Sequence, residues 1–190
     1  MGILKQRKIA WLLAVILVIG STLLSSHIKL DKKCSQVTDG FYNGVNYDGY
    51  LHPSIFTQLK NISSYSLGIS TIAENYGIDT TELTELRGHL ETNLSDSNNS
   101  KNKITELYEN YTALVPVVNQ VINELNTKSL SERDASGFSE YKTNIDGAVS
   151  TINSAGYNES VTTFMSNEYR VFPTSILGKL SGVHTPDYFA

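Results

Sequence analysis

The sequence has almost no cysteine, and this sets a first limit on how the chain is stabilised. Cys34 is its only cysteine among 190 residues, so the chain has no internal disulfide framework. It also lacks the HExxH, CxxC and EF-hand patterns that bind metals. No glycine-rich phosphate loop and no GxSxG nucleophile motif occurs. We therefore expect no enzyme activity, no catalytic residue, no metal and no cofactor.

One polar pair is the nearest approach to a metal site. Glu85 and His89 are four residues apart and would share one face of a helix, so both could contact the same ion. Two ligands do not complete a site, and a solvated polar pair is the favoured interpretation.

Residues 9–28, IAWLLAVILVIGSTLLSSHI, contain no acid, lysine or arginine. As a helix rising about 1.5 Å per residue, this run spans roughly 30 Å, the thickness of a bilayer's hydrocarbon core. It is longer than the apolar region of a typical signal peptide, and no small-x-small cleavage site closes it. The favoured interpretation is an uncleaved transmembrane anchor that contacts the lipid bilayer through residues 9–28. The short basic segment 1–8 precedes it.

Other interpretations of this run remain open. A cleaved secretory signal fits the basic start, whereas a lipoprotein signal at Cys34 would have the charged residues Asp31, Lys32 and Lys33 before it. A buried core helix would need more apolar sequence around it than the chain offers. Basic residues flank both ends of the run, which makes the positive-inside rule nearly a tie. We expect a cytoplasmic N-terminus and an extracytoplasmic C-terminal domain.

Charge is divided unevenly along the chain. Residues 1–34 hold six Lys or Arg and one Asp, whereas residues 35–190 hold nine Lys or Arg and eighteen Asp or Glu. The second part thus carries a net charge of −9, which would repel phosphates. We predict that the chain binds no nucleic acid.

Apolar residues recur at helical spacing throughout the rest of the chain. A stripe from Leu30 to Val45 indicates that the first helix continues beyond the anchor until glycines and His52-Pro53 stop it. Further stripes predict helices over 55–76, 83–94, 104–125 and 138–171, separated by polar segments at 95–103 and 126–136. No period-two pattern predicts a strand.

These stripes predict an all-α fold. An N-terminal transmembrane helix would continue into an antiparallel bundle of about four long helices with an irregular C-terminal strap. The expected bundle covers residues 29–172, and the strap, residues 173–190, would pack on it. The eleven tyrosines are interpreted as rings that fill the bundle core with hydroxyls at its edge. Alternatively, those near the anchor face a partner or the lipid headgroups.

Several short motifs in the last fifty residues resemble one family. They are Asn144-Ile145, Gly156-Tyr157-Asn158, Val161, Phe172-Pro173 and the closing Asp187-Tyr188-Phe189-Ala190. They resemble the C-terminal half of the LemA family, which has a Tyr-Asn pair, a following helix, a Phe-Pro stop and an aromatic pair in its tail. The usual Arg before Tyr-Asn is Gly156 here, and residues 51–56, LHPSIF, keep only the Pro of a family motif in the first helix. Residues 76–132 match only as helices.

The resemblance implies a bacterial membrane protein with an N-terminal anchor and a long-helix bundle. It implies no reaction, because the family has no generally established activity. We expect a scaffold or protein-interaction module with a protein partner at the membrane surface, or alternatively a ligand-binding or sensor-type extracytoplasmic domain that acts through a partner. The candidate interaction or bundle-closing residues are Tyr157, Asn158, Phe172, Pro173, Tyr188 and Phe189.

Overall fold

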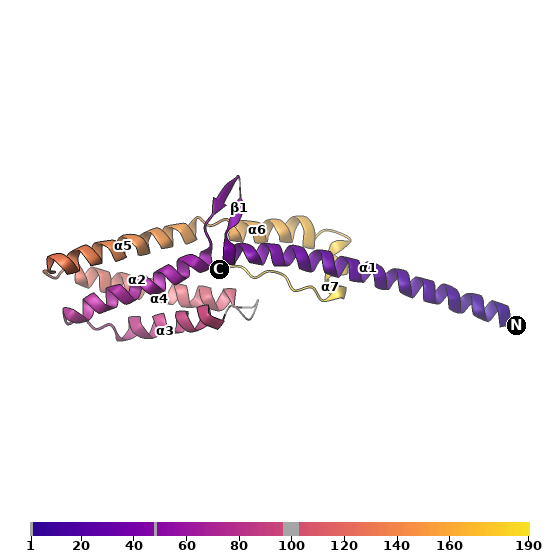
Figure 1. The fold of residues 1–190 in the computed structure, drawn as a ribbon. Helices are drawn as coiled ribbons and strands as arrows, with labels where there is room; N and C mark the ends of the chain where they lie inside the picture. The colour runs from indigo at the N-terminus through magenta and orange to yellow at the C-terminus, as the bar shows by residue number, and fades with distance from the viewer. Residues whose placement is uncertain (1, 48, 97–102) are drawn as a thin grey trace. The chain divides into compact units, whose positions relative to one another are not determined.

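The computed structural model describes residues 2–47, 49–96 and 103–190, and nearly all of its regular structure is helical (Figure 1). The predicted all-α class is confirmed. In chain order the elements are α1 (Gly2–Asn43), β1 (Val45–Tyr47), β2 (Tyr50–His52), α2 (Ile55–Asn75), α3 (Thr81–Asp96), α4 (Ile104–Leu125), α5 (Glu132–Asn153), α6 (Tyr157–Phe164), the π-helical turn η2 (Met165–Tyr169) and α7 (Thr174–Ser181).

The chain divides into two compact units. The first unit comprises Met1–Val37 and Val161–Pro186, and the second comprises Thr38–Ser160 and Asp187–Ala190. Helices α1 and α6 therefore each contribute residues to both units. The four predicted segments, 1–8, 9–28, 29–172 and 173–190, stay a prediction.

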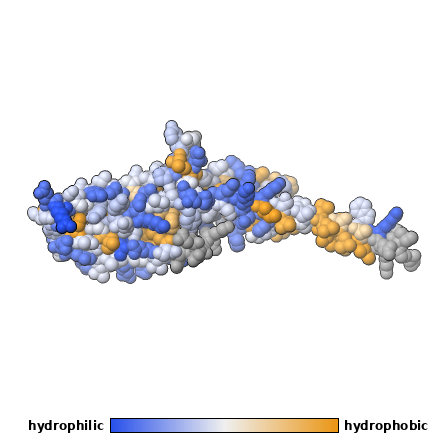
Figure 2. Space-filling model, in the orientation of Figure 1, coloured by the Kyte–Doolittle hydropathy of each residue, from blue (hydrophilic) through white to orange (hydrophobic). Residues whose placement is uncertain are grey.

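In the first unit, α1 is one uninterrupted helix, as the stripe beyond residue 28 predicted. Its window of highest mean hydropathy, 2.2, is unburied in the structure, and the helix is long and apolar enough to cross a membrane. Figure 2 shows these apolar side chains along the N-terminal half of α1. The interpretation as a core helix is therefore wrong for the chain as described, because no other segment covers this run.

Farther along α1, the C-terminal segment of the first unit covers one side of the helix. Leu30 and Cys34 are buried there. The Cys34 thiol donates a hydrogen bond to the His184 carbonyl oxygen, with 2.7 Å between sulfur and oxygen. Lys33 forms an ion pair with Glu168 of η2. This segment of α1 is therefore packed as protein, unlike residues 9–22, which are exposed.

A short β-ribbon follows α1, and the prediction that the chain has no strand is wrong at this place. β1 pairs antiparallel with β2, with Val45 opposite His52 and Tyr47 opposite Tyr50. Gly44 ends the helix with a φ of 91°, a left-handed conformation that favours glycine. Gly49 at the tip has a φ of 81°. The Asp-Gly pair at residues 48–49 is a typical hairpin signal, and it is the signal that periodicity alone overlooks.

The second unit is built on a bundle of α2, α3, α4 and α5 joined by short connections (Figure 1). Helix α2 packs on all three of the others. The core consists of fully buried aliphatic side chains: Leu59, Ile62, Ile69, Leu83, Leu90, Leu107, Leu114, Leu125 and Ile145. Pro116 lies within α4, which continues through it to Leu125. Burial of these stripes is the main favourable term in the stability of the unit.

Local capping residues set the ends of these helices. The Ser54 hydroxyl accepts a hydrogen bond from the Thr57 N–H and begins α2, and Gly77, with a φ of 71°, follows its end. Helix α5 begins at Glu132, inside the segment 126–136 predicted as a polar connection. Ser131 caps it by accepting from the Asp134 N–H. The other predicted polar segment, 95–103, mostly lies outside the described residues.

The C-terminal third differs from its prediction in two details. The stripe predicted across 138–171 is interrupted, because α5 ends at Asn153 and α6 begins at Tyr157. Helix α7 has eight residues, about two turns, within the segment 173–190 that was predicted as an irregular strap. Gly182 ends α7 in a left-handed conformation, and the remaining residues are irregular, as expected for the strap.

Candidate functional site

The last residues of the second unit pair with the start of α6 through three hydrogen bonds. The Tyr157 hydroxyl donates to the Asp187 carbonyl oxygen over 2.6 Å. The Asn158 side-chain amide donates to the Phe189 carbonyl oxygen over 2.9 Å and accepts from the Phe189 N–H over 3.0 Å. One amide thus pairs with both backbone polar groups of Phe189. We call Tyr157, Asn158, Asp187 and Phe189 the C-terminal clasp.

The rings of the clasp lie in an aromatic cluster. Phe189 is 5% exposed, and its ring centroid lies 5.6 Å from that of Phe41, 5.1 Å from Tyr108 and 5.7 Å from Tyr111. Tyr157 is fully buried, and its ring lies 5.5 Å from that of Phe41. Burial, and to a smaller extent the neighbouring Tyr108, raises the pKa of Tyr111. The arrangement is that of a packed apolar core.

The structure brings together three of the six predicted site residues. Tyr157, Asn158 and Phe189 belong to the clasp, and Tyr188 lies between two clasp residues with 39% of its surface exposed. Phe172 and Pro173 lie in the first unit instead, where Phe172 is 77% exposed.

Three rings of the aromatic cluster were missing from the predicted site. Phe41, Tyr108 and Tyr111 were predicted only as members of helical stripes. Their spacing indicated the buried face of a helix but carried no information about which distant residue packs there.

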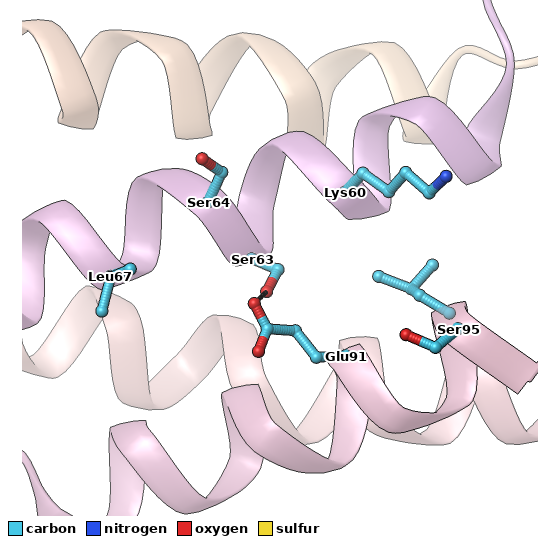
Figure 3. A pocket seen from close by; sticks show the side chains of 7 residues that line it. Lys60, Ser63, Ser64, Leu67, Glu91 and Ser95 are labelled. Carbon is cyan, nitrogen blue, oxygen red and sulfur yellow. Dashed lines mark hydrogen bonds between the residues drawn. The ribbon is translucent and has the colours of Figure 1, made fainter.

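A groove of about 530 Å³ lies between α2 and α3 (Figure 3). Lys60 and Ser63 line it from α2, and Glu91 lines it from α3. The Ser63 hydroxyl donates to the Glu91 carboxylate over 3.3 Å, and Arg87 pairs with the same carboxylate over 2.6 Å. The Lys60 ammonium lies 4.4 Å from the centre of the Phe56 ring. The charged groups of this groove therefore already have partners within the protein.

A second groove, of about 600 Å³, lies between α2 and α5 and is lined by two tyrosines. The ring centroids of Tyr65 and Tyr141 are 6.2 Å apart. A Cβ atom at Gly68 would overlap the ring of Tyr141, so the absence of a side chain there lets this ring lie directly on α2. Arg133 and Asp134 form the polar end of the groove.

Asp134 belongs to a network that joins the end of α2 to the start of α5. The Tyr76 hydroxyl donates to the Asp134 carboxylate over 2.9 Å and accepts from the Ser131 N–H over 2.8 Å. The Ser131 hydroxyl donates to the same carboxylate over 2.7 Å. These hydrogen bonds, from Ser131 first and then from Tyr76, hold the pKa of the Asp134 carboxyl below its usual range. The Asp134 carboxylate thus links Tyr76 at the end of α2 to Ser131 at the start of α5.

Replacing Asp134 with asparagine is expected to lower the melting temperature at neutral pH. The folded state favours the ionised carboxylate, so its contribution to stability is present above the unfolded pKa of about 3.9. That contribution disappears as the pH falls through the lower pKa of the folded state. The difference in melting temperature between wild type and Asp134→Asn should therefore become smaller at acidic pH. Thermal melts across a pH series measure it. Asp146→Asn, which removes only a surface pair with Lys142, is the matched control. A constant difference at every pH would contradict the assignment.

Metal-ligating groups do not gather within the described residues. No group of three or more His, Cys, Asp or Glu side chains there lies close enough to hold an ion. Glu85 and His89 are 3.8 Å apart on the surface of α3 and are both mostly exposed.

Comparison with known proteins adds no relative. No family model, no curated protein and no solved structure matches the chain. The site must therefore be interpreted from its own chemistry.

Proposed function

We propose that this chain is a single-pass membrane protein whose helical bundle serves as a scaffold or protein-interaction module at the membrane surface. The observation that carries the proposal is the exposed apolar half of α1. Trp11, Leu17 and Val18 are 74%, 71% and 64% exposed. Exposing a continuous apolar run of this length to water is strongly unfavourable, whereas lipid solvates it.

The clasp supports a LemA-like membrane protein as the more specific proposal. The motifs that carry the resemblance, Tyr157-Asn158 and Asp187–Ala190, are distant in sequence yet hydrogen-bond to each other. If this chain and the LemA family close their bundles in the same way, the motifs that they share should meet in one cluster. The proposal extends to a bacterial membrane, an extracytoplasmic C-terminal domain and a protein partner.

Placing two charges in the run is expected to release the protein from membranes. Val15→Lys combined with Ile19→Lys puts two ammonium groups at the centre of the span, each costing about 3 kcal/mol of insertion free energy. The protein should move from the carbonate-resistant membrane fraction to the soluble fraction of bacterial cells. Leu67→Lys, at an exposed apolar position of α2, is the matched control and should stay in the membrane. Loss of residues 9–28 from the mature wild-type chain, seen by intact mass, would instead identify a cleaved signal.

The partner and the orientation are tested in the same cells. A pull-down from crosslinked membranes should recover the same protein with wild type in repeated experiments, and its absence would count against a scaffold. Protease added to intact cells should remove the C-terminal domain. Protection of that domain would place it in the cytoplasm.

The tyrosine-lined groove favours a second candidate function, a ligand-binding or sensor-type domain. Tyr65 and Tyr141 offer two ring surfaces beside the polar Arg133, which suits a small molecule with an aromatic or apolar part and an anionic group. A small molecule that raises the melting temperature of wild type, but not of Tyr141→Ala, would favour this alternative.

A further inference from the structure

Helix α7 contacts α1 near the end of the candidate span. Gly178 is buried, and a Cβ atom there would lie 3.3 Å from Leu30 Cδ1 and 2.9 Å from Tyr169 Cε2. The absence of a side chain at Gly178 therefore makes room for the ring of Tyr169 and for Leu30 of α1. Since the apolar run ends at residue 28, α7 lies beside the turn of α1 at which the hydrocarbon core would end.

A groove between α1 on one side and η2 and α7 on the other lies at the same depth. It measures about 420 Å³ and is lined from α1 by Ser26, Lys29, Leu30 and Lys33. Leu177 of α7 is among the residues on its other side. The last turns of the span and the first basic residues after it therefore both face the C-terminal segment of the first unit.

The opposite side of this segment carries an exposed apolar stripe. Phe172, Ile176 and Leu180 are 77%, 52% and 69% exposed. Ile176 and Leu180 are four residues apart and share one face of α7, and Phe172 lies in the turn just before the helix. Val171, 45% exposed, extends the stripe. Large exposed apolar side chains in a contiguous group mark a surface that contacts another phase or molecule.

The part of the first unit that carries the stripe is rich in basic side chains. The segments 29–33 and 165–182 together hold five basic residues and two acidic ones, for a net charge of +3. The basic residues are Lys29, Lys32, Lys33, Arg170 and Lys179, and each is exposed. An exposed apolar stripe in a part of the chain with net positive charge fits the boundary between acyl chains and anionic headgroups.

We propose that the stripe Phe172–Ile176–Leu180 inserts into the interfacial layer of the bilayer that α1 spans, with anionic headgroups at the exposed basic side chains of the same unit. This inference rests on the proposed membrane span. A lipid surface is favoured over a protein partner because α1 fixes α7 at the depth of that layer. The chain would then contact the membrane at two places, through the span of α1 and through α7 in the interfacial layer.

The test is a depth measurement on the full chain in vesicles of phosphatidylcholine and phosphatidylglycerol. Single cysteines carrying a nitroxide are placed at Leu180, Leu17 and Leu67 in a Cys34→Ser background, which keeps a hydroxyl donor for the His184 carbonyl oxygen. Oxygen partitions into lipid and a nickel chelate into water, so their relative collision rates report depth. Leu17→Cys is the reference for the span, and Leu67→Cys, 48% exposed on α2, is the aqueous reference.

We expect the label at Leu180 to collide more with oxygen than with nickel, at a depth between the two references. Its depth should decrease in vesicles of phosphatidylcholine alone, because the attraction between the basic side chains and anionic headgroups is lost. A nickel accessibility equal to that at Leu67 would overturn the proposal, and low accessibility to both reagents would identify a protein-covered surface instead. An unchanged depth without phosphatidylglycerol would overturn the headgroup assignment. An aqueous label at Leu17 would overturn the span itself, separately from the stripe.

Discussion

Replacing Phe189 with alanine is expected to destabilise the second unit by about 3 kcal/mol, at the lower end of the range for buried phenylalanines. The Phe189 ring is 5% exposed and contacts Phe41, Tyr108 and Tyr111, so its removal leaves a cavity among three aromatic rings. For a chain of this size the melting temperature should fall by roughly 10 °C. Far-UV circular dichroism of the detergent-solubilised chain measures the change.

Phe172→Ala is the matched control, because it removes the same ring from an exposed position. Its melting temperature should stay within about 2 °C of wild type, since surface substitutions usually change stability by less than 0.5 kcal/mol. An equal fall in melting temperature for the two variants would mean that the packing of the Phe189 ring in the clasp adds no stability beyond that of an exposed ring. Removal of residues 174–190 extends the test, and a bundle that melts cooperatively at an unchanged temperature would rule out a packing role for the tail.

The second large effect is expected from Asn158→Ala, at about 2 kcal/mol of unfolding free energy. The Asn158 amide is the donor to the Phe189 carbonyl oxygen and the acceptor from its N–H. Alanine leaves both backbone groups without this partner in a partly buried place, and unpaired buried polar groups are costly. Urea denaturation should show a lower midpoint with an unchanged slope.

Asn153→Ala provides the comparison, because Asn153 is an exposed residue at the end of α5. It should change the midpoint little. If Asn158→Ala were equally mild, the two hydrogen bonds would add nothing beyond those that water forms with the unfolded chain. The Phe189 ring alone would then hold the tail in place.

Most of the helices could be predicted from sequence because their buried faces repeat at helical spacing. Leu59, Ile62 and Ile69 of α2 are fully buried, as are Leu107 and Leu114 of α4. The errors fall where local chemistry overrides that pattern. The β-ribbon depends on left-handed glycines at Gly44 and Gly49, and α5 begins early because Ser131 caps it.

The site was predictable only in part. Tyr157, Asn158 and Phe189 were singled out by resemblance, and they meet in the clasp. The same reasoning grouped Phe172 with them, although it lies in the other unit with most of its ring exposed. A sequence motif shows that residues recur together, but only packing distinguishes a ring that fills a core from one that faces another phase.

The alkylation rate of the single thiol can measure how often the structure around it opens. Cys34 is buried and bonded to the His184 carbonyl oxygen, so an alkylating reagent reaches it only when the tail moves away from α1. Where opening and closing are faster than alkylation, the observed rate divided by that of a free thiol equals the fraction of time spent open. Since no other cysteine competes for the reagent, this protection factor reports the free energy of the least costly opening that exposes Cys34.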